Sequence, residues 1–398
     1  MKYHNLIYWF ALKSVQGLGN VGYRLLVDAF GSPAAVFNAS LPRLRAIAGI
    51  GEVTARQILQ FRGWDLAENE FTLLEKNRSV IVTYKDPQYP RNLLNIYDFP
   101  PFLYVKGTLL QEDIPVAVVG SRLASAYGRF STERLSRELA LSGITVVSGL
   151  ARGIDSAAHR GAISGHGRTI AVLGCGLDII YPSENVRLYE TIPDHGALVT
   201  EYPFGTSPHK HNFPARNRLI SGISYGVAVV EAGEKSGSLI TARFALEQGR
   251  EVFAVPGAID SAGSRGTHKM IRDGARLIES AREIIEEISP QIVRLKKTPP
   301  QPAAKAVQNE NDIPLGTDSG VGHSDSGHDG ACPSKANVIN PQSDQATVMR
   351  ILSHAPLDID GMVAETGLHI ADIQRILLSL ELQGSITKLP GNNYKIKD

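Results

Sequence analysis

The strongest constraint in this sequence is a pattern of short apolar runs that repeats from Val116 to Val255. Each run ends at a glycine, serine, glutamate or proline, and most are followed by a longer helical pattern. Near-continuous apolar runs that alternate with helices are typical of parallel strands covered on both faces. The pattern therefore predicts a doubly wound α/β sheet with strands at Val116–Val119, Thr145–Val147, Thr169–Leu173, Ala197–Thr200, Val227–Val230 and Val252–Val255.

The turns after these strands form the expected binding region, because open α/β sheets bind ligands outside the carboxyl ends of their strands. The first turn, Gly120-Ser121-Arg122, combines backbone N–H groups, a hydroxyl and a guanidinium, which together suit a phosphate. The second turn repeats this set with Ser148, Gly149 and Arg152. Asp155 is expected to cap the next helix; a metal site with His159 is the weaker reading, because no third ligand is visible.

The segment from Tyr202 to Arg218 is the most informative stretch of the chain. Its cations are Lys210, Arg216 and Arg218, and no Asp or Glu lies between Thr206 and Gly222. Phe213 lies among these cations. A basic groove with an interleaved aromatic side chain suits single-stranded nucleic acid, because cations follow the phosphates and bases stack on the ring.

The alternative is a solvated loop whose Phe213 belongs to the hydrophobic core. We favour binding, because Arg122 and Arg152 are expected in the same crevice. Asn217 and Ser238 complete the candidate set, the latter in a further phosphate-compatible turn, Glu231–Ser238.

The sequence lacks the motifs of the common cofactor and hydrolase sites. The segment closest to the dinucleotide-binding pattern GxGxxG is Gly174-Cys175-Gly176, but Ile179 stands in the place of its third glycine. Gly233–Ser238 only distantly resembles a P-loop, and no GxSxG is present. A lone acid such as Glu231 is more often a hydrogen-bonding group than a general base. We therefore expect no catalytic residue, no cofactor and no metal.

The segments before the sheet predict a small helical domain and a connection. Within residues 1–65, Gly17-Leu18-Gly19 and Ile47–Gly51 each precede a helical pattern, which resembles a helix-hairpin-helix of the SAM-like kind. Such glycines let a backbone approach a phosphate, but a packing module needs them equally, so both roles stay open. Residues 66–115 are expected to connect this domain to the sheet and to add an edge strand at Phe102–Lys106.

The sheet domain is expected to span residues 116–289, and two further segments follow it. Residues 290–342 are rich in Pro, Ser, Gly, Asp and Asn and are expected to be a disordered linker. Residues 343–398 have the pattern of three helices and a hairpin, which predicts a winged helix. This segment has five Lys/Arg against seven Asp/Glu, which favours protein interaction over tight DNA binding.

Taken together and in order, the motifs VGSR, SGLARGID, HxFPxRNR at His211–Arg218, ISG, EAGEKSGSLITA and VPG resemble the DprA/Smf family over roughly residues 80–290. The resemblance implies an extended Rossmann-like fold that binds single-stranded DNA, protects incoming strands and loads RecA during natural transformation. It implies DNA contacts by Arg122, Lys210 and Phe213. It also implies a homodimer formed through about Ala258–Ile288, and it leaves single-strand binding protein open as another partner.

The prediction is thus a non-enzymatic, single-stranded DNA-binding recombination mediator. The alternative is a nucleotide-processing enzyme of a related Rossmann-like fold, but the loop Lys210–Arg218 suits a polymer better than a mononucleotide. We expect a cytoplasmic protein without membrane contact, because Met1–Phe10 lacks a signal-peptide pattern and no apolar run approaches a membrane span. Cys175 and Cys332 form no disulfide or metal pattern.

Overall fold

The computed structural model describes residues 3–297, 341–353, 357–366, 368, 373, 376, 377, 380, 385–389 and 393–396. The chain divides into two compact units, Met1–Asn309 and Glu310–Asp398, and each is described by itself. Among the described residues, no helix combines the length and the apolar composition needed to cross a membrane.

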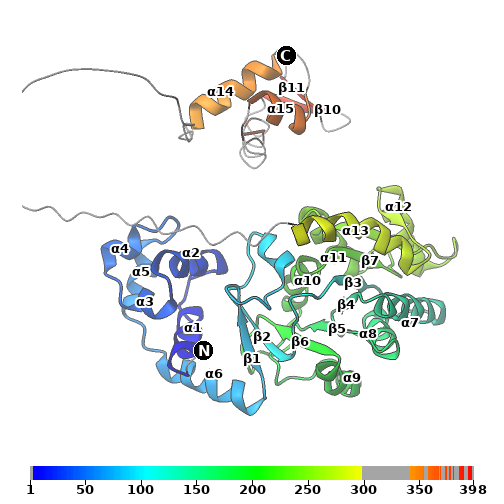
Figure 1. The fold of residues 1–398 in the computed structure, drawn as a ribbon, viewed down its shortest axis with the longest axis horizontal. Helices are drawn as coiled ribbons and strands as arrows, with labels where there is room; N and C mark the ends of the chain where they lie inside the picture. Colours follow the sequence, from blue (N-terminus) through cyan, green and yellow to red (C-terminus); the bar gives the residue numbers. More distant parts are fainter. Residues whose placement is uncertain are drawn as a thin grey trace, which may run out of the picture. The chain divides into compact units, whose positions relative to one another are not determined.

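The first unit is built on a nine-stranded sheet in the order β1-β2-β6-β5-β4-β3-β7-β8-β9 (Figure 1). From β6 to β9 all neighbours are parallel, and β1 and β2 are antiparallel additions. The six predicted strands are confirmed. The strands are β1 Val80–Thr83, β2 Phe102–Gly107, β3 Pro115–Val119, β4 Thr145–Ser148, β5 Thr169–Val172, β6 Gly196–Thr200, β7 Gly226–Val229, β8 Glu251–Ala254 and β9 Arg276–Leu277.

The direction of winding reverses at β3. The chain adds β4, β5 and β6 on one side of β3 and then returns to add β7, β8 and β9 on the other side. This reversal is the topological switch point at which doubly wound sheets bind their ligands.

One strand expectation is wrong. The segment at Phe102–Lys106 was expected at the edge of the sheet, but β2 lies between β1 and β6. Val80 pairs with Val105, and Tyr104 pairs with Thr200. The first four residues of β2 are buried, as an interior strand requires, whereas the true edge strand β1 is too short to give a sequence signal.

Helices cover both faces of the sheet, and the strands alternate accordingly. Ala117 and Val119 face a cluster with α10 (Asn212–Ile223) and α11 (Ser238–Glu247). Val116 and Val118 face a second cluster with α7 (Ala126–Leu141), α8 (Ile154–Ser164) and α13 (Ala281–Lys297). Two shorter helices add to the cores: Tyr189 of α9 (Val186–Thr191) lies in the core that the sheet shares with the N-terminal helices, and Met270 of α12 (Arg265–Arg272) packs against the cluster of α10 and α11.

The N-terminal helices belong to the same unit as the sheet and share its core (Figure 1). Trp9, Phe10 and Tyr23 form ring contacts with Phe102, and Phe10 stacks on Tyr104 with the ring centroids 5.9 Å apart. The two predicted glycine turns precede helices, as expected. The helices are α1 Tyr3–Lys13, α2 Asn20–Phe30, α3 Pro33–Phe37, α4 Leu41–Arg45, α5 Glu52–Leu59 and α6 Trp64–Lys76.

The second unit contains α14 (Pro341–Leu352), α15 (Ile359–Thr366) and an antiparallel hairpin of β10 (Ile386–Leu389) and β11 (Asn393–Ile396). Val348, Met362, Leu377 and Tyr394 are part of its core. Helix α13 continues to Lys297, beyond residue 290 where the linker was expected to begin. The rest of that expected linker up to residue 340 lies outside the described residues.

Candidate nucleic-acid interface

Two adjoining hollows lie at the switch point, where β3, β4, β5 and β7 end. The larger is an open groove of about 840 Å³, and a small hollow of about 40 Å³ shares Arg122, Phe213 and Arg216 with it. We call the two together the switch-point groove. Ten of the twelve predicted site residues line it: Gly120, Ser121, Arg122, Gly149, Arg152, Lys210, Phe213, Arg216, Asn217 and Ser238.

The ring of Phe213 lines both hollows of the groove and is half-buried. A Cβ on Gly174 would come within 2.9 Å of its Cδ1, so the ring rests directly on the backbone after β5. The Tyr181 ring lies 5.4 Å away, and the Arg122 guanidinium lies 5.3 Å from the Phe213 centroid. This arrangement offers an aromatic platform beside an exposed cation, the combination on which bases stack in single-strand sites.

The turn that carries Arg122 is fixed by backbone contacts. Ser121 donates its N–H to the carbonyl of Glu231, and its own carbonyl accepts from the N–H of Ile154. A Cβ on Gly120 would lie 2.6 Å from Ile154 Cγ1 and 2.8 Å from the Glu231 carbonyl, so only glycine fits there. The exposed guanidinium of Arg122 is therefore presented from a rigid base.

Glu231 acts as a hydrogen-bonding group, as predicted. Its carboxylate accepts from the N–H of Ser125 at 3.1 Å and from the Ser125 hydroxyl at 2.6 Å. The Ser125 hydroxyl also accepts from the N–H of Gly128 and so caps α7. The buried carboxylate thus fixes the loop between β3 and α7.

Arg216 forms the floor of the groove and is only 3% exposed. Its Nη1 donates to the carbonyls of Gly149, at 2.8 Å, and Val172. Burial lowers the pKa of Arg216, and burial raises the pKa of Asp155, an effect that the positive charge of Arg216 opposes. Arg216 therefore has a buried guanidinium that is hydrogen-bonded to the backbone beneath the groove, whereas Arg122 is exposed.

Asp155 differs from its predicted role. It lies in the first turn of α8, but its Oδ2 accepts from the N–H groups of Gly149 and Ala151 in the preceding loop. His159 is buried with Nδ1 2.7 Å from the Thr169 hydroxyl, and burial lowers its pKa to about 3. The described residues contain no group of three or more His, Cys, Asp or Glu that could hold a metal ion.

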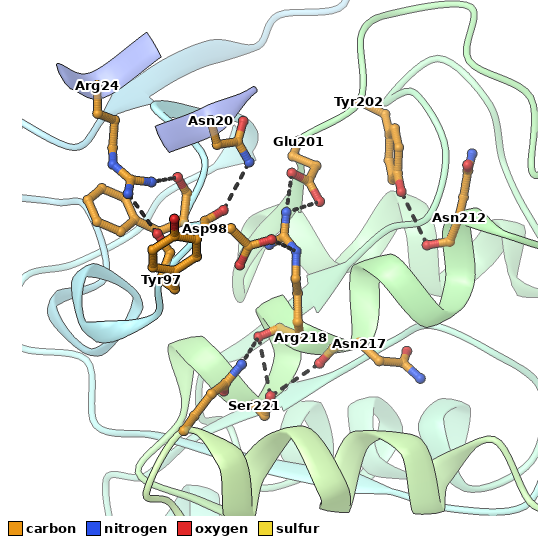
Figure 2. Close-up of polar contacts among 12 residues, drawn as sticks. Asn20, Arg24, Tyr97, Asp98, Glu201, Tyr202, Asn212, Asn217, Arg218 and Ser221 are labelled. Carbon is orange, nitrogen blue, oxygen red and sulfur yellow. Dashed lines mark hydrogen bonds and ion pairs between the residues drawn. The ribbon is translucent and has the colours of Figure 1, made fainter. Parts of the chain in front are cut away.

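Two predicted residues lie outside the groove. Ser148 is fully buried and donates its hydroxyl to the Val118 carbonyl. Arg218 forms ion pairs with Glu201 at 2.7 Å and Asp98 at 2.9 Å (Figure 2). Each helical residue rotates by about 100°, so residues 216 and 218 point to nearly opposite sides of α10.

The remaining cations differ in how freely they face the groove. Lys210 is exposed immediately before α10, whereas the exposed Arg152 pairs with Glu184. The prediction missed Tyr181 and Lys235, which also line the groove. Lys235 could have been found from its place in the turn Glu231–Ser238, but Tyr181 lies well beyond the end of β5, where no motif marks it.

Comparison with known proteins assigns all three parts of the chain. Residues 80–289 match the family model of DNA recombination-mediator protein A, residues 333–392 match the DprA winged helix domain, and residues 11–62 match a SAM-like helix-hairpin-helix tandem. The predicted combination of a helical hairpin domain, a Rossmann-like sheet and a winged helix is therefore confirmed.

Relatives extend this match over almost the whole chain. Protein Smf of Synechocystis is 36% identical over 98% of both chains, and protein Smf of Escherichia coli is 38% identical over 87% of this chain and 85% of its own. The X-ray structure of DNA processing protein A from Streptococcus pneumoniae has 37% identity and a TM-score of 0.62, covering 71% of this chain and 97% of that one. The chain thus belongs to the DNA recombination-mediator protein A family, also called DprA/Smf.

Proposed function

We propose that this protein is a non-enzymatic recombination mediator that binds single-stranded DNA in the switch-point groove. The observation that carries the proposal is the half-buried Phe213 ring, flanked by the exposed cations Arg122 and Lys210 in an open groove. The ring can stack on a base while the cations neutralise neighbouring phosphates. An open groove of about 840 Å³ suits a polymer better than an enclosed pocket would.

We further propose that the bound strand is protected and handed to RecA during natural transformation, in the cytoplasm. Membership of a family of DNA recombination mediators supports this role, and relatives in Bacillus subtilis and Streptococcus pneumoniae carry the name DNA processing protein. Single-strand binding protein remains a further candidate partner.

The proposed homodimer uses the surface within Ala258–Ile288. Ile259 is 92% exposed and Leu277 is 44% exposed, and both line an open hollow beside α12. Exposed apolar side chains that line one hollow are typical of interaction surfaces. Sedimentation at increasing protein concentration tests the dimer, and Ile259→Asp is expected to shift the equilibrium towards monomer.

The decisive experiment is a salt titration of oligothymidine binding by the wild type, Arg122→Ala, Lys210→Ala and Phe213→Ala. Loss of one phosphate contact should reduce the slope of log affinity against log salt by about 0.7. Phe213→Ala should weaken binding by about 1–3 kcal/mol and leave the slope nearly unchanged, because stacking releases no counterion.

Arg243→Ala is the matched control, since this exposed arginine lies on α11 outside the groove and pairs with Glu247. Circular dichroism establishes that each variant is folded. Binding by Arg122→Ala and Lys210→Ala that equals the control at every salt concentration would exclude the groove as the DNA site.

A further inference from the structure

The segment from Glu201 to Arg218 carries three groove residues, Lys210, Phe213 and Arg216. Residues from the N-terminal part of the chain contact this segment at both of its ends. No described residue that lines the switch-point groove precedes Val119. The N-terminal helices therefore do not line the groove, and their contacts with this segment are a route by which they can affect binding.

The first end is held by α6. The N–H of Phe204 donates to Glu70 Oε1 at 2.9 Å. The Phe204 side chain is buried, and its ring meets Tyr104 of β2 edge to face with the centroids 5.5 Å apart. Glu70 thereby fixes the start of the loop that leads to Lys210.

The second end is held through Arg218, whose side chain is only 12% exposed. Figure 2 shows its guanidinium between Glu201 and Asp98, with Asn20 and Arg24 of α2 on the far side of the Asp98 loop.

Helix α2 holds the Asp98 loop by its backbone. Asn20 Nδ2 donates to the Asp98 carbonyl at 2.9 Å, and Arg24 donates to the carbonyls of Tyr97, at 2.8 Å, and Phe99. The Arg24 guanidinium also lies 3.5 Å from the centre of the Phe99 ring. The loop is therefore a rigid bridge between α2 and α10.

We interpret Arg218 as a residue that binds the Asp98 loop and not as a phosphate ligand. Carboxylates already pair with its Nε, from Asp98, and with its Nη2, from Glu201, and its carbonyl accepts from Gln248 Nε2 at 3.1 Å. Because α10 is one continuous helix that carries both residues, a rotation at Arg218 would be transmitted to Phe213, whose ring contacts Gly174 and Tyr181.

We propose that the N-terminal helices are a positioning element for the switch-point groove, with Arg218 and Glu70 as the positioning residues through which they hold the segment 201–218. The proposal rests on the single-strand binding proposed above, which the helices tune without touching the strand.

The test uses the full-length protein with Asp98→Asn, which removes the charge, and Glu70→Met, which removes the acceptor of the Phe204 N–H; both keep the approximate size of the side chain. Glu133→Gln is the control, because the Glu133 side chain, at 43% exposed, is about as exposed as that of Asp98, at 47%, and its ion pair with Arg160 lies outside the groove. Without DNA, hydrogen exchange in α10 should accelerate about two- to fivefold in Asp98→Asn, and exchange in residues 202–211 should accelerate in Glu70→Met. Neither change is expected in the control.

With oligothymidine, both variants should bind about two- to fivefold more weakly with the wild-type salt slope, because no phosphate contact is lost. The double variant Arg218→Gln/Glu201→Gln removes both charges, so neither remains buried alone, and its slope should also be unchanged. A slope reduced by about 0.7 in this double variant would make Arg218 a phosphate ligand and overturn the proposal.

Exchange and affinity that match Glu133→Gln in both single variants would also overturn it. If the wild type binds no single strand at all, the proposed function fails, while the exchange measurement alone still decides whether the helices position α10.

Discussion

Replacing Arg216 by alanine is the sharpest test of how the groove is built. The sequence placed Arg216 among the phosphate contacts, but the structure buries its guanidinium beneath Phe213, 5.8 Å from the ring centroid. The substitution removes hydrogen bonds to the carbonyls of Gly149 and Val172 and the positive charge that faces Asp155. We therefore expect the main loss to be in stability.

The structure sets the size of this loss. Arg216 Nη1 donates to the buried carbonyls of Gly149 and Val172, and removing the donor of a buried carbonyl costs about 1–3 kcal/mol, so we expect a loss of about 2–6 kcal/mol. Asp155 Oδ2 and Arg216 Nη2 both lie beside Gly149, where a Cβ would be 2.7 Å from the first and 2.8 Å from the second, so the charge of Arg216 also acts on Asp155. Because typical domain stability is about 5–15 kcal/mol, we expect a clearly weakened variant.

Urea unfolding followed by tryptophan fluorescence measures the loss. Trp9 lies in the core that the N-terminal helices share with the sheet, and Trp64 packs against it, so both report on the first unit. Arg243→Ala is again the surface control. The reasoning is refuted if Arg216→Ala unfolds within about 0.5 kcal/mol of wild type while its salt slope for oligothymidine falls by about 0.7.

The stability lost in Arg216→Ala should also depend on pH, in a direction that follows from the pKa of Asp155. Burial already raises the pKa of Asp155 above its ordinary value, and loss of Arg216 removes the charge that opposes this shift. An acid whose pKa is raised in the folded state destabilises the fold above that pKa, and the penalty disappears as pH falls through it. The stability deficit of Arg216→Ala should thus shrink as the pH is lowered from 7, and adding Asp155→Asn should abolish this trend.

Three further outcomes are expected. Since burial lowers the pKa of His159 to about 3, folding stability should fall as pH drops below about 6.5, by up to about 1.4 kcal/mol per pH unit, and His159→Gln should remove this component in pH-dependent urea unfolding. Purified protein should not hydrolyse ATP, DNA or mononucleotides, because the Glu231 carboxylate is engaged by Ser125; turnover that disappears in Glu231→Ala would instead favour a nucleotide-processing enzyme. Deletion of residues 343–398, with five Lys/Arg against seven Asp/Glu, should leave oligothymidine binding within about tenfold of wild type in a gel-shift assay, whereas a larger loss would assign DNA contacts to the winged helix.

Sequence alone was sufficient for the parts of the fold that depend on local pattern. The six apolar runs give the parallel strands, because a strand buried on both faces must be apolar throughout. The turn Gly120-Ser121-Arg122 was found for a similar reason: its place after a strand puts it at the carboxyl edge of the sheet in any doubly wound fold. The edge strand β1 escaped notice because four residues carry too weak a pattern.

Tertiary structure decided which of the cations face the groove. Arg216 and Arg218 are nearly equivalent in sequence, yet one forms the floor of the groove and the other pairs with Glu201 and Asp98. Helical rotation separates the two side chains, but only the packing of α10 against the sheet and the Asp98 loop determines which side each one faces. The sequence shows that Arg218 is charged, but its partners Asp98 and Glu201 lie in distant segments that only folding brings to it.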